Sequence, residues 1–247
     1  MAVHGGVDLV RDKLMFCFDP ISKATYPGSG TKANDLFGKE GTIGGSPTFN
    51  QSVGYMTLNG NSSDDFVTYE DSSDFTFATG GQDEPMTIEC WYRHHTHVGG
   101  HPNLIGKGQY NHGSFPAEWV IRVINSQPYW IVHRQGAYIG RYYNVALTAD
   151  TWYYMTFTYD GSESSSGMKV YYNLAQVDNA SNNGGGSYTG MTADGAKVTI
   201  GSYGATGQGG ATVTIDGDVG PIRIYNKVLS LTEMTQIFNA QRNRFGV

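Results

Sequence analysis

The sequence predicts an all-β protein, an antiparallel jelly-roll β-sandwich closed by one short C-terminal helix. Its composition is the first indication: 34 of 247 residues are glycine, 17 are tyrosine and only 15% are charged, which is typical of many short strands joined by tight turns. Short apolar runs bounded by Gly, Asn, Asp and Ser also recur from end to end. The length suits a single domain over 1–247, in which a strand and loop-rich segment, 1–50, packs on the sandwich.

The strands are expected, in chain order, at 14–19, 54–60, 65–70, 86–94, 103–108, 118–125, 129–134, 151–160, 168–173, 196–203, 211–216 and 220–226. A turn-rich stretch over 26–41 separates the first two, and the Gly- and Asn-rich 181–190 is a loop. In 151–160, Trp152 and Tyr154 alternate with Met155, Phe157 and Tyr159. A strand that is apolar on both faces belongs in the centre of a sheet and packs against a second layer.

A helix is expected over 230–242, where the pattern changes to a period of 3.6 residues. Ser230 and Glu233 form a capping box that begins the helix. Leu231, Met234 and Ile237 or Phe238 then form one apolar stripe that docks the helix on the sheets.

The charge and the cysteines limit the class of protein. A formal net charge of −6, without any basic cluster, argues against nucleic acid or an anionic membrane as partner. No run of about 18 apolar residues predicts a membrane span, and the N-terminus lacks the apolar core of a signal peptide. Assembly in a cytoplasm is therefore expected, with Cys17 and Cys90 as buried free thiols.

Four of the seven histidines lie between His94 and His101. His94 and His95 must point to opposite faces of the strand that contains them, so they cannot share one metal ion. His95 and His97 have the His-x-His spacing that resembles cupins, which keeps a cupin-type metalloenzyme as the weakest alternative. Because the cupin glutamate and second motif are missing and a Gly-Gly pair follows, a surface or interface loop is favoured.

Several motifs together resemble laminin-G-like domains of the concanavalin A-like lectin and glucanase superfamily. They are TWYYMTFTYDGS (151–162), KVYYN (169–173), LNGNSSDDFV (58–67), MTIECWYR (86–93), VTIGSY (198–203) and IDGDVGPIRIYNKVLSLTE (215–233). The resemblance covers roughly residues 55 to 247 and implies a concanavalin A-like jelly roll. Leu174 follows Asn173 where the family has glycine, so this hairpin turn is expected to differ from the two-residue type.

Both ends of the chain are similar to a narrower group, the laminin-G-like proteins of tailed phages. The opening is FCFDPISKATYPGSGTKANDLFGKEGTI (16–43) and the ending is FNAQRNRFGV (238–247). This resemblance implies a virion structural protein, first of all a capsid decoration or knob displayed on a phage head. Its partners would be other virion proteins, above all the major capsid protein, and it would act as a homo-oligomer on the particle surface. A lectin-like fibre or tail-tip adhesin that binds host surface glycans is the alternative.

Catalysis is not expected. Glucanases of this superfamily carry Glu-x-Asp-x-Glu or a close variant, which places alternate acids on one face of a strand. None of the glutamates, at 40, 70, 84, 89, 118, 163 and 233, begins such a motif. No cofactor is expected either, although relatives bind calcium at the sandwich rim and Asp216 and Asp218 in IDGD are weak calcium candidates.

The candidate ligand contacts are aromatic, arginine and histidine side chains near turns. They are Tyr138, Arg141, Tyr142, Tyr143, Tyr203, His95, His97 and His101. Tyr and Arg suit either a glycan or a protein partner, although stacked aromatics are equally expected as ordinary cross-strand pairs.

Overall fold

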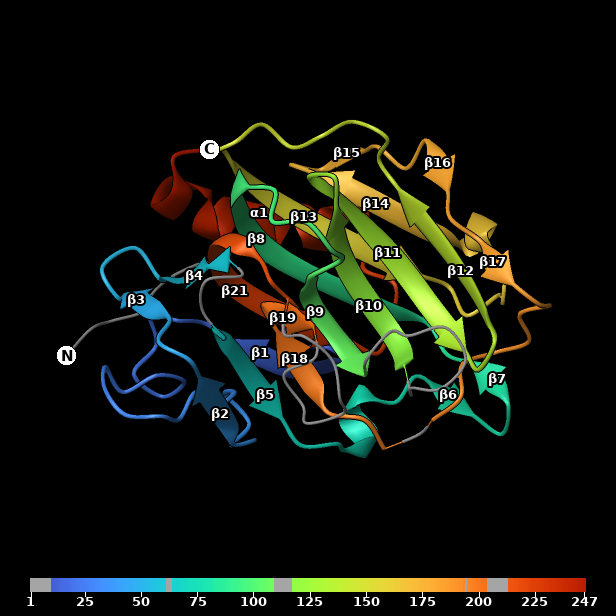
Figure 1. Cartoon of the computed structure of the whole chain (residues 1–247), viewed down its shortest axis with the longest axis horizontal. Coiled ribbons are helices and arrows are strands. Elements are labelled where there is room, and N and C mark those ends of the chain that lie inside the picture. Colours follow the sequence, from blue (N-terminus) through green and yellow to red (C-terminus); the bar gives the residue numbers. More distant parts are fainter. Residues whose placement is uncertain (1–9, 61–63, 109–116, 194, 204–212) are drawn as a thin grey trace.

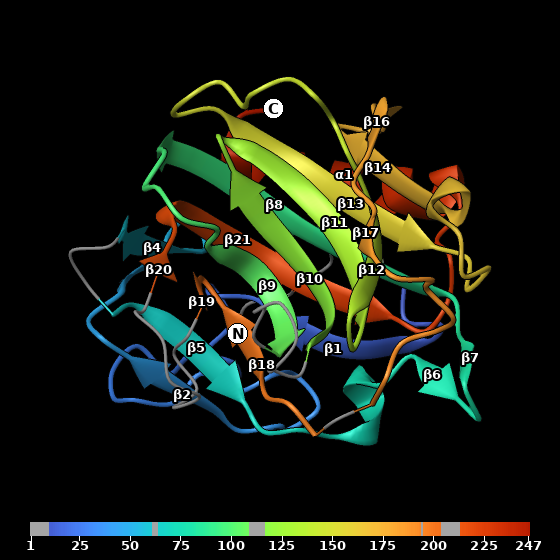
Figure 2. The ribbon, with the colours of Figure 1, turned by 45° about the vertical axis from the view of Figure 1, so that its right-hand side comes forward.

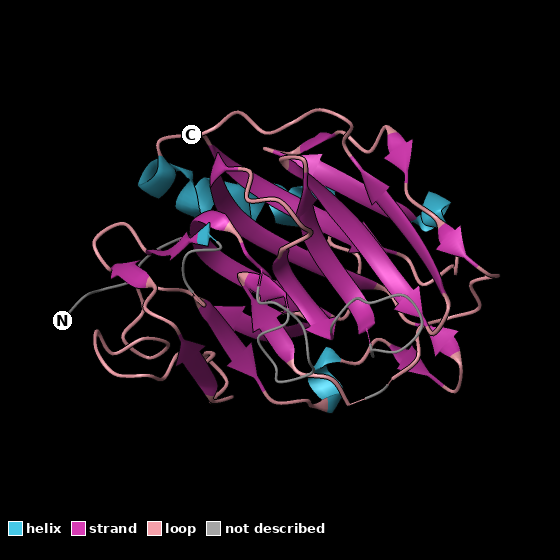
Figure 3. Ribbon diagram, in the orientation of Figure 1, coloured by secondary structure: helices cyan, strands magenta, loops and turns pink. Residues whose placement is uncertain are grey.

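The computed structural model describes residues 10–60, 64–108, 117–193, 195–203 and 213–247. Two large antiparallel sheets lie face to face, and one α-helix lies on the outer side of one of them (Figures 1 and 3). This architecture confirms the predicted jelly-roll sandwich. No helix in the described ranges is long and apolar enough to cross a membrane.

The first sheet contains eight strands, seven of them in the order β15-β14-β13-β8-β21-β4-β3, with β1 paired to β21. Their bounds are β1 Leu14–Phe18, β3 Thr48–Asn50, β4 Tyr55–Asn59, β8 Met86–Thr96, β13 Trp152–Tyr159, β14 Met168–Tyr172, β15 Ala175–Gln176 and β21 Asp216–Tyr225. The long strands β8, β13 and β21 form the centre of the sheet.

The second sheet contains nine strands, eight of them in the order β16-β12-β11-β10-β9-β18-β5-β2, with β17 paired to β12. Their bounds are β2 Gly41–Gly44, β5 Phe66–Tyr69, β9 Asn103–Gly108, β10 Ala117–Ile124, β11 Gln127–Arg134, β12 Ala137–Tyr142, β16 Ala180–Ser181, β17 Gly184–Gly185 and β18 Val198–Ile200. Two small hairpins pair β6 Ala78–Thr79 with β7 Gln82–Asp83, and β19 Ser202–Tyr203 with β20 Val213–Thr214. Short 3-10 helices cover Ser73–Phe75 and Ser165–Gly167.

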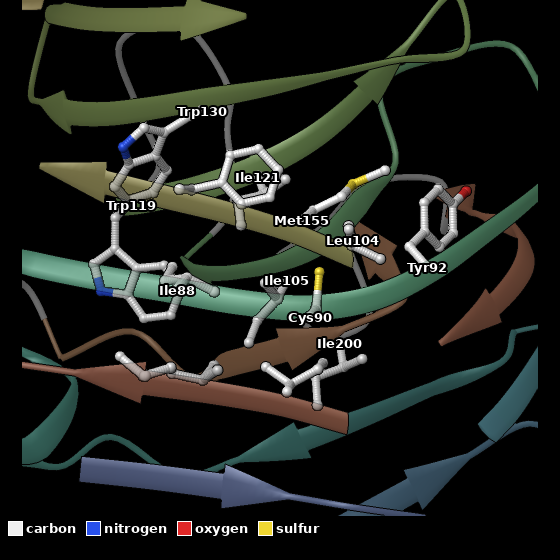
Figure 4. Close-up of a cluster of buried hydrophobic side chains, with 14 of the residues drawn as sticks. Ile88, Cys90, Tyr92, Leu104, Ile105, Trp119, Ile121, Trp130, Met155 and Ile200 are labelled. Carbon is white, nitrogen blue, oxygen red and sulfur yellow. The ribbon is translucent and has the colours of Figure 1, made fainter. Parts of the chain in front are cut away.

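The main hydrophobic core lies between the two sheets. Alternate residues of β8, namely Ile88, Cys90 and Tyr92, face Trp119 and Trp130 of the second sheet (Figure 4). Both tryptophan indoles are satisfied inside the core: the Trp119 Nε1–H donates to the Phe75 carbonyl at 2.8 Å. Burial of this continuous aromatic and aliphatic layer is the dominant force that holds the sheets together.

Helix α1 (Leu231–Phe245) builds a second apolar layer on the outer face of the first sheet (Figure 2). The helix begins with the predicted Ser230–Glu233 capping box. The predicted stripe is partly wrong, because Leu231 is 56% exposed. The buried stripe instead runs from Met234 to Phe245, whose ring stacks on Trp91 at 4.4 Å between centroids. The helix extends one turn beyond the predicted end, and that turn supplies its largest aromatic contact.

A buried polar row runs under the helix. Arg223 of β21 forms an ion pair with Glu89 of β8, and both side chains are inaccessible to solvent. Gln241 of α1 accepts a hydrogen bond from the Trp91 indole at 2.9 Å beside this pair. Cys17 lies opposite Arg223 in the same layer, and burial raises the pKa of its thiol to about 11. Cys90 faces the core on the other side of the sheet, and both cysteines are free, as predicted.

Two expectations, one about a hairpin turn and one about a strand, need correction. Asn173 and Leu174 alone connect β14 to β15 with φ values of 48° and 71°, so the turn is of the two-residue type that Leu174 was expected to preclude. The Asn173 carboxamide oxygen accepts from the Tyr154 N–H at 2.9 Å, and Leu174 packs against the helix layer, which offsets the strain of a left-handed leucine. Residues 137–142, treated only as a contact site, form β12.

Candidate functional site

A row of unlike side chains crosses the outer face of the first sheet at the end that α1 leaves uncovered. Trp152 of β13 lies opposite Arg93 of β8, and Arg93 lies opposite Asp218 of β21. Asp218 in turn lies opposite Thr57 of β4. Because directly opposed residues of antiparallel strands share a face, strand register alone brings these four side chains from distant parts of the sequence together.

A β-bulge shapes this end of the sheet. Asp216 pairs with Thr96 and Gly217 pairs with His94, so His95 is an extra residue between them. A Cβ on Gly217 would lie 2.5 Å from the Arg93 carbonyl oxygen, so only glycine permits this close approach of β21 to β8. The sequence IDGD therefore places Asp216 and Asp218 on the outer face on either side of an obligatory glycine.

Asp218 is the centre of the hydrogen-bond network, and its side chain is only 1% exposed. One carboxylate oxygen accepts from the Thr57 hydroxyl at 2.5 Å. The other accepts from Arg93 Nε at 2.7 Å and from His95 Nε2 at 3.0 Å. These charge-assisted bonds compensate the burial of the carboxylate and fix both basic side chains.

The Arg93 guanidinium also contacts two aromatic rings. Its central carbon lies 5.1 Å from the centroid of Trp152 and 5.5 Å from that of Tyr55, within the range of a cation–π interaction. The Trp152 ring packs in turn on Phe245, in the last turn of α1, at 4.6 Å. Arg244 of that turn is held by Asp19 through two hydrogen bonds of 3.0 Å. The aromatic side of the site thus rests on a rigid support.

Two further carboxylates border the site on its open side. Asp216 Oδ1 lies 3.5 Å from His95 Nδ1, and Asp150 Oδ1 lies 3.9 Å from His95 Nε2. Asp150 occupies a left-handed turn before β13, at φ 57°, which aspartate tolerates better than most residues. We call this set the Arg93 platform: Tyr55, Arg93, His95, Asp150, Trp152, Asp216 and Asp218.

The Arg93 platform combines a fixed polar network with groups that solvent reaches. The exposed fraction is 28% for Arg93, 26% for His95 and 30% for Asp216, and 78% for Asp150. Tyr55 and Trp152 are partly exposed as well. Aromatic rings beside hydrogen-bond donors and acceptors can bind a molecule that has an apolar face and several hydroxyl groups.

The geometry bears on the calcium candidates. Asp218 already accepts from Thr57, Arg93 and His95, and a calcium ion there would lie against the Arg93 guanidinium. Among the described residues, no group of three or more His, Cys, Asp or Glu side chains is arranged to hold a metal ion. Calcium at Asp216 and Asp218 stays a prediction, and it would require both basic side chains to move.

The structure separates the four predicted contacts around β12. Tyr142 stacks on Tyr129 of β11 at 3.9 Å between ring centroids, and Tyr138 packs on His133 of the same strand at 5.6 Å, both on the outer face of the second sheet. Arg141 points away and donates to the Asp178 carboxylate at 2.9 Å, which fastens the segment after β15. Tyr143 contacts Tyr172 at the core edge. The two ring pairs are cross-strand pairs, the alternative that the sequence left open.

The histidine-rich segment is divided as well. His94 turns inward and its Nε2 lies 2.9 Å from the Ser126 hydroxyl, so His94 and His95 do face opposite ways. His97 lines a narrow crevice with His94, Tyr92 and Asp216, and the His-x-His interpretation of His95 and His97 stays a prediction. Burial, together with the Arg122 guanidinium of the second sheet, lowers the pKa of His101.

Tyr203 pairs with Val213 in the small hairpin of β19 and β20, and the loop predicted beyond it, 204–212, lies outside the described residues.

A comparison with protein families decides what kind of domain this is. The family described as the concanavalin A-like lectin/glucanases superfamily matches residues 59–235, which is most of the chain. The protein belongs to the concanavalin A-like lectin/glucanase superfamily. No curated protein sequence matches it.

Solved structures of the same fold include a toxin binding domain, a sialidase and a neurotoxin. The binding domain of Paraclostridial Mosquitocidal Protein 1 superimposes with a TM-score of 0.64 at 13% identity, covering 92% of this chain and 52% of that one. A Trypanosoma rangeli sialidase gives 0.63 at 13% identity, with 94% and 33% covered. A structure of botulinum neurotoxin type C, whose cell entry depends on interaction with two ganglioside molecules, gives a TM-score of 0.62 at 13% identity, with 93% and 51% covered. This chain spans a third to a half of the length of these proteins.

Within this concanavalin A-like domain, sequence reasoning found His95, Asp216 and Asp218 but assigned them to two separate sites. It missed Arg93, Tyr55, Trp152 and Asp150 as members of the same site. Arg93 and His95 are two residues apart in a strand, so their shared face was the available signal. Trp152 lacked any such signal, because its register against Arg93 appears only when β13 pairs with β8.

Proposed function

We propose that this protein is a non-enzymatic, lectin-like glycan-binding protein that acts as an adhesin, and that the Arg93 platform holds the sugar. The observation that carries the proposal is the partly exposed Trp152 beside Arg93, His95 and Asp216. A sugar presents an apolar C–H face for the indole and hydroxyl groups for the charged side chains. The membership of the lectin/glucanase superfamily supports the proposal.

The non-enzymatic part of the proposal rests on the position of the acids. Glycoside hydrolysis needs two carboxyl groups that flank an accessible bond. Glu89, the glutamate of β8, is buried beneath α1 and paired with Arg223. Asp218 is buried and engaged by Thr57, Arg93 and His95. Asp150 and Asp216, the solvent-accessible carboxylates of the platform, both border the same His95 ring and do not occur in the Glu-x-Asp-x-Glu pattern of the glucanases of this superfamily.

A second part of the proposal concerns where the protein acts. The phage-like opening at 16–43 and ending at 238–247 support a component of a virus particle, either a capsid decoration or a fibre or tail-tip adhesin. Quantitative mass spectrometry of gradient-purified particles distinguishes these roles by copy number. Copies comparable to the major capsid protein mean a head decoration, a handful mean an adhesin, and absence from the particles would refute a virion role.

Glycan binding is tested by calorimetry against host surface polysaccharide, with and without a chelator. The Trp152→Ala variant is expected to bind about tenfold more weakly, because it loses the indole surface. Tyr142→Ala is the matched control, since it removes a partly exposed aromatic ring from the outer face of the other sheet. Thermal unfolding of each variant verifies that it folds.

Each outcome of the calorimetry has a distinct meaning. Loss of affinity in Trp152→Ala with Tyr142→Ala unchanged supports the platform. The reverse pattern would place the site on the β11–β12 face, and loss of heat with chelator would mean that binding depends on a calcium ion. Absence of heat for every glycan would refute lectin-like function.

A further inference from the structure

The charges of the Arg93 platform are unequal. Three carboxylates, Asp150, Asp216 and Asp218, surround two basic side chains, Arg93 and His95. Asp218 directly neutralises Arg93 through the hydrogen bond from Nε. The guanidinium charge of Arg93 is therefore neutralised within the protein and attracts an incoming anion only weakly.

The carboxylates on the open side have weaker partners. Among the described residues, the ion-pair partner of Asp216 is the His95 ring, at 3.5 Å, and Asp150 lies farther from that ring, at 3.9 Å and mostly in solvent. A ligand that rests on Trp152 and reaches His95 must approach both of them. An acidic sugar then meets two like charges, which repel it, whereas a protonated amino group meets two acceptors.

The charge of the whole chain acts in the same direction. The formal net charge is −6, so the long-range field also disfavours an anionic ligand and favours a cationic one. Close contacts and the distant field therefore agree.

Resting on the glycan-binding function proposed above, we propose that the Arg93 platform selects sugars by charge: it binds amino sugars most tightly, uncharged sugars more weakly, and excludes acidic sugars. The recognised group is a hexosamine with a free, protonated amine that approaches Asp150 and Asp216, which lie beside the two nitrogens of the His95 ring. This specificity differs from the ligands of two proteins of similar fold, a sialidase in complex with sialic acid and a neurotoxin that interacts with gangliosides.

Trimers of equal length provide the test. Calorimetry compares glucosamine trimer, N-acetylglucosamine trimer and galacturonate trimer at pH 6 to 7, at low and at moderate salt. The amine form is expected to bind at least tenfold more tightly than the acetylated form, and the acidic trimer not to bind. The advantage of the amine should shrink as salt is added, because these charges are partly exposed.

The variants separate local from global charge. Asp216→Asn is expected to reduce the ratio between the amine and acetylated trimers several-fold, because asparagine removes the negative charge that attracts the amine but keeps an oxygen that accepts a hydrogen bond from a sugar hydroxyl. Glu40→Gln is the matched control, because it removes one exposed negative charge beside β2, in the other sheet, and should leave the ratio unchanged. An equal effect of both variants would overturn the local assignment.

The charge selection and the glycan-binding function can be refuted separately. If the acidic trimer binds as tightly as the amine, the charge selection is wrong while glycan binding stands. If the amine and acetylated trimers bind equally and Asp216→Asn changes nothing, the proposed role of Asp216 is wrong. If none of the trimers and no host polysaccharide binds, lectin-like function itself is refuted.

Discussion

Replacement of Arg223 by methionine is the sharpest test of how α1 is held on the sheet. Arg223 and Glu89 are fully buried between the sheet and the helix and neutralise each other. Methionine has a similar length but no charge, so Arg223→Met leaves the Glu89 carboxylate buried without its cation. Removal of one partner of a buried pair typically destabilises a protein by about 3–5 kcal/mol. That is a large part of the total stability of about 5–15 kcal/mol that domains usually have.

The assay is equilibrium urea unfolding. With a slope of about 3 kcal/mol per molar urea, Arg223→Met should lower the midpoint by about 1 M or more without changing the slope. The double variant Glu89→Leu, Arg223→Met removes both charges and should unfold within about 1 kcal/mol of the natural protein. A cost below about 1 kcal/mol for the single variant would refute the inference that both charges are excluded from water and that each needs the other as its partner.

The same variant has a defined pH dependence. Burial raises the pKa of Glu89 even though Arg223 opposes this shift. A carboxyl whose pKa is raised by folding binds more protons in the folded state, so stability rises as the pH falls. Without Arg223 the shift is larger, and the deficit of Arg223→Met should shrink on acidification. A deficit that stays constant or grows as the pH falls would contradict this account.

Three further predictions concern separate elements. Partial burial opposes ionisation of Glu233, but hydrogen bonds from Lys227 and the helix N-cap outweigh burial and lower the pKa of Glu233. The stability advantage of the natural protein over Glu233→Gln should therefore be complete above about pH 4.3 and disappear as the pH falls through the folded pKa. An advantage that persists in acid refutes this prediction. Leu174→Gly should be about 1 kcal/mol more stable than Leu174→Ala in urea unfolding, because both lose the leucine side chain but only glycine relieves the left-handed strain; equal stability would mean that the turn is unstrained. Gly220→Ala should cost about 2 kcal/mol by thermal unfolding, since its Cβ would lie 2.8 Å from Trp91 Cβ and 3.0 Å from the Phe245 ring of α1. A neutral effect would mean that the last turn of α1 shifts easily.

The strands that sequence reasoning found share strong local patterns, and those it missed do not. The alternation in 86–94 and 151–160 predicted β8 and β13 nearly to the residue. Strand β12 was missed because Gly140 and Arg141 interrupt its apolar pattern, and it exists because β11 pairs along its whole length. Strands β2 and β3 were also missed, because they are too short to show a local pattern, and they form by pairing with β5 and β4.

The sequence by itself determined the layers of this protein: which strand residues face the core, where the helix begins, and that the chain folds as an antiparallel β-sandwich. These properties depend on local periodicity and on capping residues a few positions apart. Only the tertiary structure decided the site, because the members of the Arg93 platform meet through the register of strands that lie more than 50 residues apart in the chain. A shift of one residue in that register would turn Trp152 or Asp218 to the opposite face, and no local pattern records which register the sheet adopts.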